Sequence, residues 1–308
     1  MKEIKVFGHQ SPDTDATTSA IVWAWFLNSR RNQPAKSYVL GTPNTEALFV
    51  LEKWGVAVPE ILTSVSAEDT IAVVDTNNAD ELFPNINETQ IVSIIDHHKL
   101  TGGLKTDSPL EVVIQPYAST MTVMFNVMNI EPTDFPREIA GLMLSGIVSD
   151  TLEFRSPTTT PADEKLAREL ASTLDINISE YAQEMFQAKS DISHFSDAEL
   201  LRLDSKINDI QGRNIRISVL ETTNPQVVLD RKDSLVENMK TVCAQDSVDD
   251  ILLFVIDILR EEAHLFVPNE STQALAEKAF GITPSSDVVI LPGIVSRKKQ
   301  IIPALSKA

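Results

Sequence analysis

The sequence predicts an α/β fold: a mainly parallel sheet flanked by helices in the N-terminal part of the chain, followed by a smaller mixed α/β domain. Short β-branched segments alternate with helical patterns in the first half, which is typical of βα units on a parallel sheet. Residues 71–74 and 91–95 are nearly continuous apolar runs, as expected for strands buried on both faces. A chain of 308 residues is long enough for about two domains.

The elements of the first half follow in order from this periodicity. Short β-branched runs predict strands, and segments with apolar residues three and four apart predict helices. The predicted strands are residues 4–7, 37–40, 71–74 and 91–95, and the predicted helices are residues 16–28, 120–128, 138–149, 162–173 and 178–189.

Residues 189–194 interrupt the helical pattern with small and polar side chains, so we expect a linker there between domains 1–188 and 195–308. The same reasoning continues into the second domain. It predicts strands at residues 214–220, 251–256, 264–267 and 287–291, and helices at residues 225–242 and 272–280.

Composition and charge exclude several classes of protein. The chain has 26 basic and 44 acidic residues, a net charge of −18, which disfavours a nucleic-acid partner. Its apolar runs fall short of the ~18 residues that a membrane span needs, so a membrane partner is not expected. A single cysteine, Cys243, cannot form an internal disulfide, which fits a reducing compartment. We therefore expect a cytoplasmic protein.

Side chains that can bind metals follow the first predicted strand. His9, Asp13 and Asp15 lie in one loop, in which Gly8 and Pro12 supply the bend. Two carboxylates two residues apart can point at neighbouring positions, which suits two metal ions. The alternative is that Asp13 only caps the next helix and His9 is a turn residue.

Similar residues follow two more strands and one helix. Asp75 comes directly after the third predicted strand, and Asp96, His97 and His98 follow the fourth. Adjacent histidines cannot both face one core, because strand side chains alternate; Asp96 is placed to orient a histidine ligand. Asp150 closes a helical segment, where a nearby cation would relieve its unfavourable position in the helix dipole. Since strand ends meet at one sheet edge, these residues predict one site.

Together these positions predict a metal centre with two imidazoles and four carboxylates. The predicted ligands are His9, Asp13, Asp15, Asp75, His97 and Asp150. A donor set of imidazole and carboxylate without thiolate favours Mn²⁺, Co²⁺ or Mg²⁺. Four clustered carboxylates repel one another, so at least two divalent ions are needed. Two ions ~3.5–4 Å apart are suited to in-line phosphoryl displacement.

A basic run, residues 296–300, contains Arg297 and Lys298 in a strongly acidic chain. Charge runs are usually solvated surface. This run follows a predicted strand and the flexible pair Pro292–Gly293, so it could instead be a loop that binds an anion. An arginine offers phosphate a bidentate fork and a lysine a point charge.

These motifs in combination resemble the signature set of the family II inorganic pyrophosphatases, manganese-dependent members of the DHH phosphoesterase superfamily. The motifs are residues 8–15, Val74-Asp75, Asp96-His97-His98, Ser149-Asp150-Thr151 with Ser156-Pro157-Thr158, and Ser296-Arg297-Lys298-Lys299. The resemblance covers essentially the whole chain. It implies a DHH metal-binding catalytic domain over 1–188, a substrate-binding DHHA2-type domain over 195–308, and an active site in the cleft between them.

The resemblance also implies a role for each site residue. One manganese ion would be held by His9, Asp13 and Asp75, and the other by Asp15, Asp75, His97 and Asp150. The diphosphate would be bound by His98, Arg297, Lys298 and a further lysine, whose place Lys206 matches. Two Mn²⁺ per subunit are expected, with Co²⁺ as a substitute and Mg²⁺ accompanying the substrate. The family also implies a homodimer formed through the N-terminal domain.

The implied activity is hydrolysis of inorganic pyrophosphate to two orthophosphates by a metal-activated water or hydroxide between two divalent cations. One alternative is a DHH-type phosphodiesterase acting on short oligonucleotides or cyclic dinucleotides. Such relatives carry a glycine-rich histidine motif in the second domain, whereas only His194 and His264 lie beyond Asp150, and neither follows a glycine run. Another alternative is a non-catalytic metal- or phosphate-binding module, which the complete set of ligands and basic residues disfavours.

Overall fold

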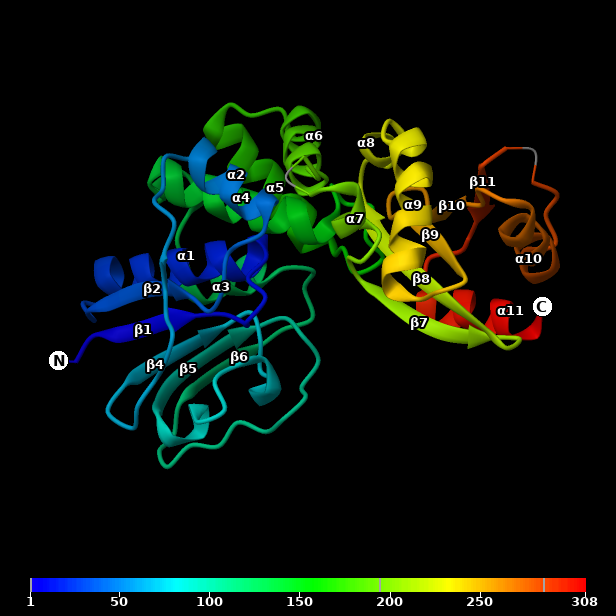
Figure 1. Cartoon of the computed structure of the whole chain (residues 1–308). Coiled ribbons are helices and arrows are strands. Elements are labelled where there is room, and N and C mark those ends of the chain that lie inside the picture. The colour runs from blue at the N-terminus through cyan, green and yellow to red at the C-terminus, as the bar shows by residue number, and fades with distance from the viewer. Residues whose placement is uncertain (1, 194, 285) are drawn as a thin grey trace. The chain divides into compact units, whose positions relative to one another are not determined.

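The computed structural model describes residues 2–193, 195–284 and 286–308, with the side chain of Lys298 outside the description. The chain divides into two compact units, residues 1–188 and residues 189–308 (Figure 1). His194, at the end of the expected linker, lies outside the described residues. Within the described ranges, none of the helices is long and apolar enough to cross a membrane.

The first unit is built on a six-stranded sheet in the order β3-β2-β1-β4-β5-β6. All five strand pairs are parallel. The strands are β1 (Ile4–Phe7), β2 (Ala35–Val39), β3 (Glu60–Ile61), β4 (Thr70–Val74), β5 (Gln90–Asp96) and β6 (Glu111–Ile114). The four predicted strands are confirmed within a few residues. Strands β3 and β6 were not predicted, because both are short, β3 is exposed and β6 is only partly buried.

Six α-helices accompany this sheet: α1 (Thr14–Arg30), α2 (Thr45–Lys53), α3 (Thr120–Met128), α4 (Arg137–Thr151), α5 (Pro161–Leu174) and α6 (Ile178–Lys189). Helix α1 packs on β1, β2 and β4, and α3 packs on β5. Helix α4 packs on α1 and α3 and is buried along almost its whole length, behind the helices that cover the sheet (Figure 1). Five of the six helices were predicted; α2, of only nine residues, was not.

The opposite face of the first sheet is covered by short segments in place of α-helices. Phe7, Ile71, Val73 and Ile94 point into this side of the core. They meet Leu82 and Ile86 and the flanking turns η1 (Ala79–Glu81) and η2 (Ile86–Glu88). The sheet is thus buried on both faces, which accounts for the nearly continuous apolar sequence of its central strands.

The second unit contains a mixed five-stranded sheet in the order β11-β10-β9-β8-β7. Only β8 and β9 are parallel, and the other pairs are antiparallel. The strands are β7 (Ser205–Ile210), β8 (Arg213–Thr222), β9 (Asp250–Asp257), β10 (Glu262–Phe266) and β11 (Val288–Pro292). Strand β7 was not predicted, because its sequence is mostly polar. It pairs with β8 through a tight turn in which Gln211 and Gly212 both have positive φ.

Helices cover both faces of the second sheet. They are α7 (Asp197–Leu200), α8 (Gln226–Leu229), α9 (Lys232–Asp246), α10 (Glu270–Phe280) and α11 (Ile302–Lys307). Alternate residues of β9 face the two sides: Leu252 and Phe254 meet α10 and α11, while Leu253 and Val255 meet α7 and α9. Each face therefore has its own apolar core.

Two expectations for this unit were wrong. The helix predicted over 225–242 is interrupted between α8 and α9, where the Arg231 guanidinium turns to donate to Asp197 and to the Ile192 carbonyl. The basic run expected as a loop is helical: Arg297–Ile301 forms a π-type turn that leads directly into α11, and the Ser296 hydroxyl caps it by accepting from Lys299 N. The apolar side chain of Ile301 anchors this turn in the core.

Candidate metal centre

Three neighbouring parallel strands end at one edge of the first sheet. The loop after β1 carries His9 and leads into α1, β4 is followed by Asp75, and β5 ends at Asp96 with His97 next. Because β4 lies between β1 and β5, Asp75 stands between the two histidines. The edge predicted to carry the site is therefore the one where these side chains meet.

The first group of candidate ligands consists of His9, Asp13 and Asp75. The Nε2 atom of His9 lies 3.7 Å from Asp13 Oδ2 and 3.6 Å from Asp75 Oδ2. Two ligand atoms that are each ~2.1 Å from one ion, at a tetrahedral angle, are about 3.4 Å apart. The observed spacings are those of atoms that can share an ion.

The second group consists of Asp15, His97 and Asp150. The Nε2 atom of His97 lies 3.6 Å from Asp150 Oδ2 and 3.5 Å from the other oxygen of Asp75, Oδ1. The two oxygens of Asp75 thus face different histidines. This carboxylate is placed to bridge two ions, and the structure brings all six predicted ligands together.

Two residues at the start of α3 hold Asp15 in place. Asp15 is buried in the first turn of α1 and accepts from the Ser119 hydroxyl at 3.0 Å and from Thr120 N at 2.7 Å. The Thr120 hydroxyl donates to Asp75 Oδ1 at 2.8 Å. Neither Ser119 nor Thr120 stood out in the sequence, where a serine before a helix is an ordinary cap.

The backbone of Asp75 has an uncommon conformation. Its φ is +56°, in the left-handed region, which aspartate tolerates better than most residues with a side chain. Its N–H donates to Ile95 O of β5 at 2.9 Å, which fixes the turn out of β4. Such conformations persist where the surrounding structure requires them, often at functional sites.

The charges of this cluster indicate a need for cations. Burial and the charge of Asp75 raise the pKa of Asp15 to about 7, and burial and the charge of Asp15 raise the pKa of Asp150. Burial opposes ionisation of Asp75, but the imidazoles of His9 and His97 lower its pKa overall. Burial disfavours both imidazolium ions, yet the facing carboxylates raise the pKa of His9 to about 10 and of His97 to about 9. Without metal ions, the cluster keeps protons that offset the negative charge of its carboxylates. Divalent ions would offset the same charge, so the residues present fit a metal pair.

The two adjacent histidines are oriented by different acceptors. Nδ1 of His97 lies 3.1 Å from the Tyr117 carbonyl, which directs Nε2 toward the carboxylates. Nδ1 of His98 lies 2.9 Å from Asp96 Oδ1, and this hydrogen bond raises the pKa of His98. The buried Asp96 also accepts from both histidine N–H groups of the backbone and from Asn77. Asp96 therefore orients the more exposed histidine, and a carbonyl orients the predicted metal ligand.

A pocket of about 320 Å³ opens beside the cluster. Its two acidic residues, Asp80 and Glu81 in the turn η1, were not singled out in the sequence. The lining residues are His9, Gln10, Ser11, Asp80, Glu81 and His98. The pocket gives a small molecule access to His9 and His98.

The basic candidates belong to the second unit. Arg297 donates to Asp204 Oδ1 at 2.8 Å and to the Asp204 carbonyl, and its side chain is only 17% exposed. Lys206 is exposed on the edge strand β7. Lys298 is part of the π-type turn, but its side chain lies outside the description. Arg297 thus contacts Asp204, which precedes Lys206 by two residues in the chain.

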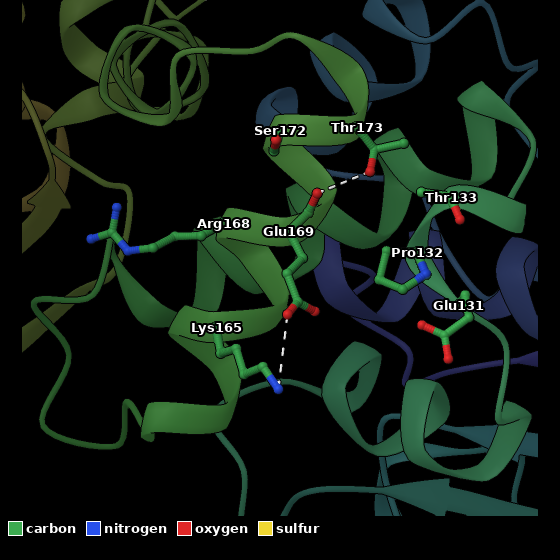
Figure 2. A pocket seen from close by; sticks show the side chains of 8 residues that line it. All are labelled: Glu131, Pro132, Thr133, Lys165, Arg168, Glu169, Ser172 and Thr173. Atoms are coloured by element: carbon green, nitrogen blue, oxygen red, sulfur yellow. Dashed lines mark hydrogen bonds and ion pairs between the residues drawn. The ribbon is translucent and has the colours of Figure 1, made fainter.

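A second, larger groove of about 480 Å³ runs along α5 of the first unit (Figure 2). Three of its four charged side chains form ion pairs: Lys165 with Glu169, and Arg168 with Glu164 outside the lining. It is lined by Glu131, Pro132, Thr133, Lys165, Arg168, Glu169, Ser172 and Thr173. These pairs leave the groove without the concentrated charge of the metal cluster.

Comparison with known families matches both parts of the chain. The profile of the DHH family, N-terminal domain, matches residues 3–147, and that of the DHHA2 domain matches residues 183–308. A Deinococcus radiodurans protein, named as a probable manganese-dependent inorganic pyrophosphatase, is 38% identical over 99% of this chain and 98% of its own length. A Lactobacillus helveticus protein of the same name is 34% identical over 100% and 99%.

Solved structures agree with this comparison. A Methanococcus jannaschii protein assigned to the family II inorganic pyrophosphatases is similar over 98% of both chains, with a TM-score of 0.63 and 33% identity. An exopolyphosphatase-related protein from Bacteroides fragilis covers 99% of this chain with a TM-score of 0.50 and 16% identity, which bears on the fold alone.

Proposed function

Because the chain belongs to the family II inorganic pyrophosphatases, which depend on manganese, we propose that it hydrolyses inorganic pyrophosphate to two orthophosphates. The single observation that carries this proposal is Asp75, whose two oxygens lie 3.6 Å from His9 Nε2 and 3.5 Å from His97 Nε2. A carboxylate that faces two ligand groups can hold two ions close together, as in-line phosphoryl transfer between two metals needs.

The proposed metal ligands form two sets that share Asp75. One set is His9, Asp13 and Asp75, and the other is Asp15, Asp75, His97 and Asp150. When bound, two divalent cations lower the pKa of water and so supply a nucleophile at neutral pH. The chain's part is to hold the ligands rigidly, through Ser119 and Thr120 for the carboxylates and Tyr117 for His97.

His98 is the proposed phosphate-binding residue of the first unit. Its pKa is raised by the hydrogen bond to Asp96, which favours the imidazolium form. With Nδ1 directed at Asp96, Nε2 is left to donate to a phosphate oxygen. Its place in the lining of the pocket beside the metal cluster supports this role.

Arg297, Lys298 and Lys206 are the proposed phosphate-binding residues of the second unit. Arg297 would supply a bidentate fork and the lysines point charges to neutralise the charge that develops on the leaving phosphate. The domain assignment is part of the same proposal: a catalytic domain over 1–188, a linker over 189–194 and a substrate-binding domain over 195–308. The order of the DHH and DHHA2 matches supports it.

Finer features of the proposal follow the family. We expect two Mn²⁺ per subunit, replaceable by Co²⁺, with Mg²⁺ accompanying pyrophosphate. A homodimer through the first unit is supported by the edge strand β6, on which Val112 is 50% exposed. Cytoplasmic localisation is supported by the single, unpaired cysteine, Cys243.

A parallel phosphate-release assay tests the function against its alternatives. Pyrophosphate, tripolyphosphate and a dinucleotide are each incubated with the enzyme and Mn²⁺ or Mg²⁺; the dinucleotide is followed by chromatography. Pyrophosphate should be hydrolysed fastest of the three. Preferred cleavage of the dinucleotide would support the phosphodiesterase, and inactivity toward all three with Mn²⁺ bound would support a binding module.

A further inference from the structure

A buried glutamate outside the ligand set lies between two segments that carry metal ligands. Glu46, in the first turn of α2, has no exposed surface. Its Oε2 atom accepts from the Thr14 hydroxyl at 2.7 Å and from the Ser149 hydroxyl at 2.6 Å. Thr14 and Ser149 are themselves buried, so these hydrogen bonds are shielded from water.

Each of these hydroxyls is next to proposed ligands in the chain. Thr14 stands between Asp13 and Asp15 at the start of α1, and Ser149 directly precedes Asp150 near the end of α4. Glu46 therefore ties the start of α1 to the end of α4. The group Asp15, His97 and Asp150 takes its two carboxylates from those two segments.

Independent contacts fix α2 against the ligand loop. Asn44 caps α2 by accepting from Ala47 N, and its own N–H donates to Pro12 O at 3.1 Å. A β-carbon at Gly41 would stand 2.9 Å from Gln10 O, so the chain entering α2 approaches that loop as closely as a glycine allows. The place of Glu46 follows from this packing and does not depend on a bound ion.

Burying a carboxylate is unfavourable, and an apolar residue of similar volume would often stabilise a fold better. The position of Glu46 is thus better explained by a role in geometry. We propose that Glu46 is a positioning residue that sets the separation of Asp15 and Asp150, and thereby the affinity of the metal site they share with His97. The inference rests on the proposed function only in taking Mn²⁺ as the ion bound.

Helix α4 offers a matched pair of variants for the test. Ser145 and Ser149 are both buried and lie one turn apart. The Ser149 hydroxyl contacts Glu46, whereas the Ser145 hydroxyl contacts Tyr181 and Trp54. Metal-stripped S149A, S145A, E46A and E46Q are titrated with Mn²⁺ by calorimetry, and the melting temperature of each is measured. S149A and E46A should weaken one of two Mn²⁺ binding steps by about tenfold or more and leave the other within about threefold.

The controls separate positioning from general destabilisation. S145A should lower the melting temperature while both Mn²⁺ affinities stay within about threefold of the parent. E46Q keeps an acceptor oxygen at the same length and should recover most of the affinity lost in E46A. Unchanged Mn²⁺ affinity in S149A, or an equal loss in S145A, would overturn the inference. Failure of the parent enzyme to hydrolyse pyrophosphate would overturn the proposed function instead, since the Mn²⁺ titrations of the pair are read without substrate.

Discussion

Gly146 leaves the space that Asp15 occupies: a β-carbon at Gly146 would stand 2.7 Å from Asp15 Oδ1. Gly146 lies in α4 and Asp15 in the first turn of α1. The two helices can bring Asp15 and Asp150 together only because position 146 has no side chain. Alanine would otherwise be the better helix former by about 1 kcal/mol.

Gly146→Ala should therefore weaken Mn²⁺ binding, because the added methyl group displaces Asp15. We expect the affinity of one Mn²⁺ step to fall by about tenfold or more, measured by calorimetry. Gly141→Ala is the control on the same helix, since its β-carbon would clash with the Trp54 ring, away from the ligands. It should lower the melting temperature without this loss of affinity. Full Mn²⁺ affinity in Gly146→Ala would show that Asp15 can move without consequence.

Asp75→Asn should be among the most damaging single changes. Asparagine keeps the size of the side chain and tolerates the positive φ, so the fold should survive. Loss of the bridging charge should remove ~4 kcal/mol of transition-state stabilisation, about a thousandfold in kcat. Steady-state kinetics with pyrophosphate and a circular dichroism melt provide the two readouts. The bridging role is wrong if the variant keeps more than a tenth of the parent turnover with both ions bound.

Exhaustive chelation should abolish activity, because the ligand set is then left without its ions. Activity should return best with Mn²⁺ or Co²⁺ and less with Mg²⁺, since imidazole donors favour the first two. Metal content is measured by mass spectrometry beside pyrophosphate hydrolysis. Full activity with residual metal shown to be absent would contradict the metal mechanism.

Arg297→Lys should keep the positive charge but lose the fork. If Arg297 binds phosphate through two N–H groups, kcat/KM for pyrophosphate should fall about 30- to 1000-fold. This corresponds to a loss of ~2–4 kcal/mol in transition-state binding. Lys298→Ala should fall in the same range, and Mn²⁺ affinity should be unchanged in both, because the proposed ligands belong to the first unit. Arg260→Lys, at a side chain 75% exposed, is the control and should be silent. Unaltered kcat/KM in both test variants would return this basic turn to ordinary surface.

Asp246 should make the second unit sensitive to acid. Hydrogen bonds from Arg202, with the charge of Arg216, lower the pKa of Asp246 below its ordinary value of about 3.9. A carboxyl with a lowered pKa contributes stability that is present above about pH 4 and lost as the pH falls further. Asp246→Asn should thus lower the melting temperature at pH 7, with the difference shrinking toward pH 3.5. Glu237→Gln removes an exposed charge from the same helix, and its melting temperature should show no such trend with pH. If Asp246→Asn lowers the melting temperature equally at all pH values, the lowered pKa of Asp246 is not the cause.

The sequence predicted the strands that carry the site and the meeting of its ligands, because both follow from local patterns. Central strands buried on two faces are apolar throughout, and the ends of adjacent parallel strands must share an edge. The sequence alone therefore predicts that Asp75 and His97 lie near each other.

The supporting residues could not be predicted in this way. Thr120 contacts Asp15 across 105 positions of the chain, and Glu46 reaches Ser149 across 103. In the sequence each looks like an ordinary helix residue. Only the packing of α3 on α1, for Thr120, and of α2 on α1 and α4, for Glu46, gives it a role. Strand β7 was missed for a related reason. It is an edge strand with most of its side chains in contact with solvent, so its sequence lacks the apolar pattern of a strand packed on a core.

The scatter of the ligands along the chain has a consequence for biosynthesis. The proposed ligands run from His9 to Asp150, and helix α4, which carries the last of them, packs behind the helices that were made first. A nascent chain cannot complete the centre until some 150 residues have left the ribosome and folded. With these proposed ligands, metal loading would follow the folding of α4, and each ion bound would add RT ln(1 + [Mn²⁺]/Kd) to the stability of the first unit.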